Sequence, residues 1–181
     1  GKSSFGYSLP SVQSTHLAGT FGRGDLTVSH TASQAAPTRS ADCLNQLEAV
    51  VAATIDPSAS ETDKLGRFPR ENLRALARVG LLGLISDPAV GGAGGGLAEA
   101  SRAVRRIAQS CPSTAMVLAM HYSATAVIEK LGTTAMRSAI AEGRHLSTLA
   151  FSEAGSRSHF WAPVSTARAD RDAFVLDAAK S

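Results

Sequence analysis

Apolar residues recur every three to four positions along most of residues 40–143, a pattern typical of amphipathic α-helices. Ser40 is a suitable N-cap for the first of them, and Asp56-Pro57 is expected to end it. The run Leu81–Ile85 is apolar on all sides and is predicted to be buried. The predicted helices run from Ser40 to Asp56-Pro57, from Pro69 to Gly80, from Leu97 to Cys111, from Ser113 to Leu131, and from Thr133 or Thr134 to Gly143.

The predicted helix from Ser113 to Leu131 is apolar on nearly every face. Such a helix lies either in the middle of a bundle or against a ligand. His121 stands out in it as a titratable group. It is either hydrogen-bonded within the core or lines a cavity, where burial would shift its proton affinity.

After Gly143 the period of the pattern changes to that of strands. The predicted fold class is therefore α+β: an N-terminal α-helical bundle followed by the first strands of a β-barrel-like domain that this chain does not complete. We expect a disordered tail over residues 1–40, a helical domain over 41–143 and the start of a β domain over 144–181. The predicted strands are His145–Phe151, Val164–Arg168 and Ala173–Asp177, with a hairpin turn at Asp170-Arg171-Asp172.

Residues 1–40 differ in composition from the rest, because Ser, Thr, Gly and Pro occupy half of these positions. Such a segment has too little apolar surface to offset the entropy of ordering, so we expect disorder. Its few acids and scattered basic residues are weakly typical of a transit peptide. The missing initiating Met and the lack of an arginine-lined amphipathic helix favour an altered start site instead.

The overall composition excludes several classes of protein. A hydrophobic fraction of 44% is enough for a core, and a net charge of +3 with two tyrosines and one tryptophan is not that of a nucleic-acid-binding surface. No apolar run is long enough to span a membrane. The two cysteines favour a reducing, cytoplasmic compartment, with the mitochondrial matrix as the alternative. His and Cys show no ligand-type spacing, so no metal site is expected.

The glycine-rich segment Gly91–Gly96 precedes a predicted helix, as phosphate-binding loops do. The strand before it and the acidic residue about 20 positions later that such a site needs are missing, so a structural turn is favoured. Arg102, Arg105 and Arg106 share one helix face, which is either solvated or meets an anionic partner.

The segment Leu149–His159 leaves a predicted buried strand, passes Glu153, and enters small polar residues. Exposed backbone N–H groups and hydroxyls at a strand end suit the polar edge or the phosphates of a cofactor, although an ordinary connecting loop would have the same composition.

Four motifs in order carry a resemblance to a known family. Ser152–His159 aligns without gaps to Thr-Glu-Pro-x-x-Gly-Ser-Asp, with Ala154, Arg157 and His159 as departures, and Asp177–Ser181 matches the start of Gly-x-Lys-x-Trp. The other two motifs are Gly80-Leu81-Leu82-Gly83-Leu84 with Pro88 and Gly91-Gly92-Ala93-Gly94, and Leu131-Gly132-Thr133. From about Asp42 to Ser181 the sequence therefore resembles the acyl-CoA dehydrogenase superfamily.

This resemblance implies a flavoprotein that holds FAD, or alternatively FMN. By position, Leu149, Phe151 and Ser152 would touch the isoalloxazine, with the Ser152 hydroxyl donating to flavin N5. Ser158 would lie near the flavin pyrophosphate and the CoA substrate, and His121 is a second candidate for substrate binding. The catalytic carboxylate of the family lies in a C-terminal bundle, so no catalytic residue is assigned in this chain.

The implied activity is α,β-dehydrogenation of an acyl-CoA, with electrons passed to an electron-transfer flavoprotein by a homo-oligomer. The 181 residues would be a fragment that is inactive alone. Two alternatives stay open. One is a two-component flavin monooxygenase of the same superfamily, for which His121 would be a cavity residue. The other is a non-catalytic helical interaction module that docks through residues 97–131.

Overall fold

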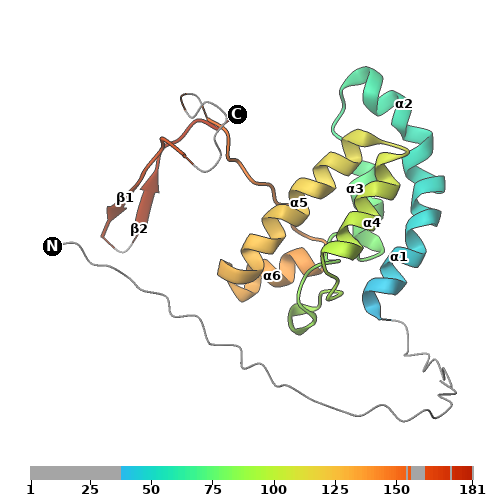
Figure 1. The fold of residues 1–181 in the computed structure, drawn as a ribbon, viewed down its shortest axis with the longest axis horizontal. Coiled ribbons are helices and arrows are strands. Elements are labelled where there is room, and N and C mark those ends of the chain that lie inside the picture. The colour runs from blue at the N-terminus through green and yellow to red at the C-terminus, as the bar shows by residue number, and fades with distance from the viewer. Residues whose placement is uncertain (1–37, 154, 156–161, 172, 181) are drawn as a thin grey trace, which may run out of the picture. The chain divides into compact units, whose positions relative to one another are not determined.

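The computed structural model describes residues 38–153, 155, 162–171 and 173–180, all within the compact unit Ala36–Ser181. A helical bundle extends as far as Ala141 and is followed by a short antiparallel hairpin (Figure 1). This is the predicted α+β fold class. The elements are α1 (Arg39–Val50), the π-helix η1 (Val51–Ile55), α2 (Asp56–Leu65), α3 (Arg70–Arg78), the 3₁₀ turn η2 (Pro88–Val90), α4 (Leu97–Ala108), α5 (Pro112–Leu131), α6 (Thr134–Ala141), β1 (Ala167–Asp170) and β2 (Ala173–Leu176).

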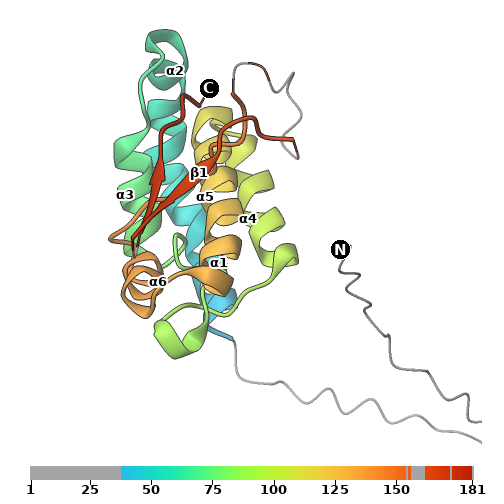
Figure 2. The ribbon, with the colours of Figure 1, turned by 90° about the vertical axis from the view of Figure 1, so that its left-hand side faces the viewer.

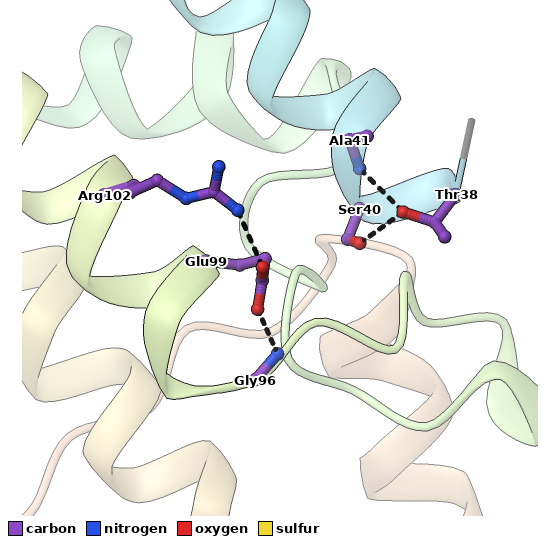
Figure 3. Close-up of polar contacts among 6 residues, drawn as sticks. All are labelled: Thr38, Ser40, Ala41, Gly96, Glu99 and Arg102. Carbon is purple, nitrogen blue, oxygen red and sulfur yellow. Dashed lines mark hydrogen bonds and ion pairs between the residues drawn. The ribbon is translucent and has the colours of Figure 1, made fainter. Parts of the chain in front are cut away.

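The first helix corrects the sequence prediction at both ends. Its N-cap is Thr38, whose hydroxyl accepts from the Ala41 N–H at 3.3 Å, whereas Ser40 lies inside the helix and bonds the Thr38 hydroxyl at 3.0 Å (Figure 3). The helix also does not end at Asp56-Pro57, because η1 joins α1 directly to α2.

A π-helical turn is what lets the chain stay helical through Pro57. A proline inside an α-helix lacks an N–H and its ring clashes with the carbonyl four residues earlier. Here the Asp56 N–H donates to the Val51 carbonyl five residues back, so the turn before the proline is wider than an α-turn. The Ser58 hydroxyl then donates to the Thr54 carbonyl at 2.9 Å.

The predicted helices after Pro69 are confirmed, with ends within a few residues of those expected. Helix α5 runs through the middle of the bundle, with α3 and α4 on either side and α6 at one end (Figure 2). That position explains why its sequence is apolar on nearly every face. The largest fully buried apolar side chains come from five elements and the loop after α3: Val51, Ile55, Leu76, Leu81, Leu84, Ile107, Leu118 and Ile140.

Two glycines of the family-like motif are explained by close approaches of backbone. A Cβ at Gly83 would lie 2.3 Å from the Ala141 carbonyl oxygen at the end of α6. A Cβ at Gly92 would lie 2.0 Å from the Ser86 carbonyl oxygen. Real Cβ atoms do not come this near to a backbone oxygen, so both contacts require glycine. The buried Leu81–Leu84 loop can therefore touch α6 and the glycine-rich segment at once.

The glycine-rich segment is a structural turn, the interpretation that the sequence favoured. Its N–H groups donate to carbonyls of the preceding loop: Ala93 to Gly83 at 3.0 Å, and Gly95 to Leu84 at 2.8 Å. The last N–H, that of Gly96, donates to the Glu99 carboxylate at 3.0 Å, and Glu99 also pairs with Arg102 at 2.7 Å (Figure 3). These donors are thus already paired within the chain.

The segment after α6 differs from the prediction. Residues 145–151 form no strand, whereas β1 and β2 pair in register from Ala167↔Leu176 to Asp170↔Ala173. Between them Arg171 has φ +53°, as tight hairpin turns require. A strand needs a partner ladder, and the one bridge formed near this segment in the described chain is Glu153↔Lys180. Among the described residues, no helix combines the length and the apolar character needed to cross a bilayer.

Candidate functional site

An apolar hollow of about 320 Å³ lies between α5 and the segment that follows the bundle. Helix α5 supplies Met116, Val117 and Met120 to one wall, and residues 146–148 form the other, with Phe68 at the edge. Met116 is largely exposed although it is apolar. The nearly all-round apolar pattern of α5 therefore serves two surfaces: one face packs in the core, and another lines this hollow.

His121 lies on the core side of α5 and is fully buried. Its Nε2 lies 3.0 Å from the Leu82 carbonyl oxygen, and its Nδ1 lies 3.1 Å from the Ser147 backbone nitrogen. Burial lowers the pKa of His121, and the nearby His145 lowers it further. Of the two possibilities for His121, the structure shows the hydrogen-bonded core histidine, with both ring nitrogens directed at backbone groups. A substrate contact for it stays a prediction.

The neighbouring Tyr122 holds the same buried loop. Its hydroxyl donates to the Leu81 carbonyl oxygen at 2.6 Å, and burial raises its pKa far above the usual value. Consecutive residues of α5 thus bind the consecutive carbonyls of Leu81 and Leu82. Because both carbonyls are buried, these bonds satisfy acceptors that water cannot reach.

The residues predicted to contact a flavin follow directly after the hollow. Leu149 is half-buried, whereas Phe151 and Ser152 are exposed. Ser158 lies outside the described residues. Leu149, Phe151 and Ser152 are neighbours in the chain and directly follow the wall formed by residues 146–148, and their contact with a flavin stays a prediction.

Glu153 is a buried carboxylate that joins three parts of the chain. It accepts from the Val164 N–H at 2.5 Å, from the Ser165 N–H at 3.2 Å and from the Ser165 hydroxyl, and it pairs with Lys180 Nζ at 2.8 Å. The Lys180 ammonium, followed by the Ser165 hydroxyl, lowers the pKa of Glu153 to about 2. These contacts give the Glu153 carboxylate a structural role.

Sequence reasoning missed Ser147 and Lys180 because nothing in their local sequence points to their partners. Ser147 is 26 positions from His121, and Lys180 is 27 positions from Glu153. The apolar pattern of α5 gave a signal for the hollow, since a helix that is apolar on nearly every face lies either within a bundle or against a ligand. Within the described ranges no cluster of His, Cys, Asp and Glu is arranged to hold a metal ion.

Comparison with known proteins adds to this geometry. The profile of the acyl-CoA dehydrogenase N-terminal domain matches residues 41–143. The chain belongs to the acyl-CoA dehydrogenase family. The loop Leu81–Leu84 and helix α5 lie within the matched domain, and residues 146–148 of the hollow follow shortly after it.

Curated relatives agree with the assignment. The chain is 31% identical over 132 residues to acryloyl-CoA reductase (NADH) of Anaerotignum propionicum, covering 70% of this chain and 34% of that protein. It is 30% identical over 130 residues to the mitochondrial short-chain specific acyl-CoA dehydrogenase of Bos taurus, covering 69% and 32%. The chain thus spans about a third of the length of these relatives. Comparison with solved structures gives no significant match.

Proposed function

We propose that this acyl-CoA dehydrogenase family chain forms the helical domain (residues 41–143) and the beginning of the β domain (residues 144–181) of a flavin-dependent oxidoreductase acting on an acyl-CoA thioester. The observation that carries the proposal is the apolar hollow beside α5, one wall of which is formed by residues 146–148, directly before the segment Leu149–Ser152 in the chain. The names of two relatives, an acryloyl-CoA reductase and a short-chain acyl-CoA dehydrogenase, agree with a thioester substrate.

The residues of the segment Leu149–Ser152 fit a flavin in their chemistry. Phe151 is 44% exposed, and Leu149 offers a second apolar side chain for a flat aromatic ring system. The exposed Ser152 hydroxyl supplies a donor for the polar edge of that ring system. A bound FAD, or alternatively FMN, would supply the two-electron acceptor that no amino-acid side chain provides. Ser158 is kept as a further proposed contact.

The chain's own residues would bind and orient the substrate. Met116 and Met120, which are unbranched and adaptable, together with Val117 give the hollow an apolar surface suited to an acyl chain. Burial of an acyl chain there would exclude water and set its direction relative to Leu149–Ser152. No residue of this chain is proposed as the base that removes the α-proton.

The wider proposals follow from family membership. They are an electron-transfer flavoprotein as partner, a homo-oligomeric assembly, and a cytoplasmic or mitochondrial-matrix location, to which the free thiols of Cys43 and Cys111 add support. The flavin monooxygenase alternative gains no support from His121, whose ring nitrogens face backbone groups. We propose the dehydrogenase-type function because the two relatives carry the names of acyl-CoA oxidoreductases.

The proposal is tested in the protein expressed from its complete reading frame. Ser152→Ala should weaken the binding of FAD or slow its reduction by acyl-CoA, because it removes the proposed donor to the flavin edge. Ser101→Ala is the matched control, since this exposed serine lies on α4, outside the segment. Flavin content by absorbance and reduction by stopped flow are the measurements.

Two results would contradict the proposal in different ways. A protein that purifies without flavin and takes up neither FAD nor FMN is not a flavoenzyme. A flavoprotein in which Ser152→Ala leaves flavin affinity and reduction rate equal to those of Ser101→Ala has its flavin elsewhere.

A further inference from the structure

We propose that His121 is a positioning residue that holds Ser147, and with it the wall of the hollow formed by residues 146–148, against helix α5. The use of the hollow for an acyl chain rests on the proposed function. The geometry of the attachment is independent of any flavin or substrate.

The contacts fix which proton His121 carries. The Ser147 N–H, 3.1 Å from Nδ1, can only donate, and the Leu82 carbonyl, 3.0 Å from Nε2, can only accept. Nδ1 must therefore be the acceptor and Nε2 the protonated donor, which is the neutral imidazole. One fully buried ring thus joins the loop after α3 to the segment after α6.

This bond lies where it can control the hollow. Leu146 and Thr148, the two neighbours of Ser147, line the hollow together with Met116 and Met120 of α5. Residues 145–152 belong to no strand in the described chain, so a sheet ladder does not hold Ser147 in place. The imidazole of His121 instead attaches this wall to the helix that forms the opposite wall.

Protonation of His121 would break the attachment. A proton on Nδ1 would place a donor against the Ser147 N–H, and neither donor would have an acceptor. The titratable groups near the ring include His145 and Tyr122. His145 disfavours a positive charge on His121. The Tyr122 hydroxyl already donates its proton to the Leu81 carbonyl. Burial and His145 both lower the pKa of His121, so the attachment is intact at neutral pH. It is lost as the pH falls below the ordinary histidine range, near 6.5.

The experiment measures hydrogen-exchange protection of the Ser147 amide in the full 181-residue chain between about pH 7 and pH 4. The variants are His121→Gln, whose amide keeps one acceptor and one donor without titrating, and His121→Phe, which keeps bulk but has neither. The protection of the Leu118 amide in α5 reports whether the bundle remains folded. Protection factors are compared with the intrinsic exchange rate at each pH.

In the wild type, Ser147 protection should fall about tenfold on acidification, the equivalent of one hydrogen bond. His121→Gln should show no such pH dependence, and His121→Phe should be about tenfold less protected throughout. Equal protection in wild type and His121→Phe, or the same pH dependence in wild type and His121→Gln, would overturn the proposal. If His121→Phe does not fold, the comparison of wild type with His121→Gln decides.

The link to substrate is measured separately in the complete flavoprotein. His121→Phe should raise KM for a saturated acyl-CoA with little change in kcat, and His121→Gln should restore KM at neutral pH. If Ser147 protection follows the expected order while no form of the protein binds acyl-CoA, the proposed use of the hollow fails and the positioning role of His121 stands.

Discussion

Replacing Gly83 by alanine tests whether the family-like glycine motif is set by packing. Gly83 has no positive φ, so an alanine there meets no backbone strain of its own. Its Cβ would however lie 2.3 Å from the Ala141 oxygen and 2.9 Å from the Ala141 carbonyl carbon. Carbon–oxygen contacts between backbones are ordinarily about 3.3–3.6 Å. The loop and the end of α6 would have to separate by about 1 Å.

The expected loss of stability follows from what this separation disturbs. The side chains on either side of Gly83, those of Leu82 and Leu84, are buried, and Ile140 beside Ala141 is fully buried. The Gly83 carbonyl also accepts from the Ala93 N–H at 3.0 Å. Overpacking of such a site costs about 1–3 kcal/mol, so we expect a loss of about 3 kcal/mol in the free energy of unfolding. That is a large share of the total stability of a domain this size.

Urea unfolding of the 181-residue chain, followed by far-ultraviolet circular dichroism, measures this loss. Gly96→Ala is the matched control, because its Cβ would lie at an ordinary contact distance of 3.6 Å from the nearest atom, a carboxylate oxygen of Glu99, and its φ is −105°. We expect the control to change stability by less than about 0.5 kcal/mol. If both variants unfold at the wild-type urea concentration, close packing is not the reason for glycine at position 83.

Two further predictions concern the hollow and the carboxylate beside it. Met120→Trp should fill the hollow and displace two to three methylenes of a bound acyl chain, a loss of about 2 kcal/mol in binding free energy that raises KM roughly 30-fold. The control Met136→Trp, on α6, should leave KM unchanged. Equal KM values in the two variants would place the acyl chain elsewhere. The pKa of Glu153 is lowered to about 2 from an ordinary 4.5, so its contribution to stability is present above pH 4.5 and is lost as the pH falls towards 2. The hydrogen-exchange protection of the Ser165 amide should fall over that pH interval in the wild type, and in Glu153→Gln it should be low at every pH. If Ser165 protection in Glu153→Gln follows the same pH dependence as in the wild type, the Glu153 carboxylate is not what protects this amide.

The helices were predictable from sequence because their signals are local. Apolar spacing fixes which face of α4 is buried, and Gly132 and Thr133 mark the boundary between α5 and α6. The failure at Asp56-Pro57 has a physical cause: a proline ends an α-helix, but a π-turn before it gives the ring room. Nothing in the sequence Val51–Ile55 indicates that wider turn.

The candidate site was predictable only in part. The segment Leu149–Ser152 was found from its composition and resemblance, whereas the contacts that position it join residues far apart in the chain. A strand was expected over 145–151 because the helical period of the apolar residues ends at Gly143, yet within the described residues this segment pairs with no strand. Residues 146–148 face α5 across the hollow, and the Ser147 backbone N–H donates to His121, so a contact with a helix side chain stands where a strand ladder was expected.

These contacts make α5 a mechanical link between the buried loop and the hollow. His121 donates to Leu82 and accepts from Ser147, and the donation to Leu82 holds the tautomer whose Nδ1 is free to accept. Gly83, the residue after Leu82, sets how closely that loop lies to α6. In Gly83→Ala the displaced loop would move the Leu82 carbonyl away from His121 Nε2. The hydrogen bond that favours the tautomer protonated on Nε2 would then be lost. Ser147 should then lose protection in Gly83→Ala even though it does not contact Gly83, and Gly96→Ala should leave it protected. Stability of the bundle and the shape of the hollow would thus depend on the same few backbone groups.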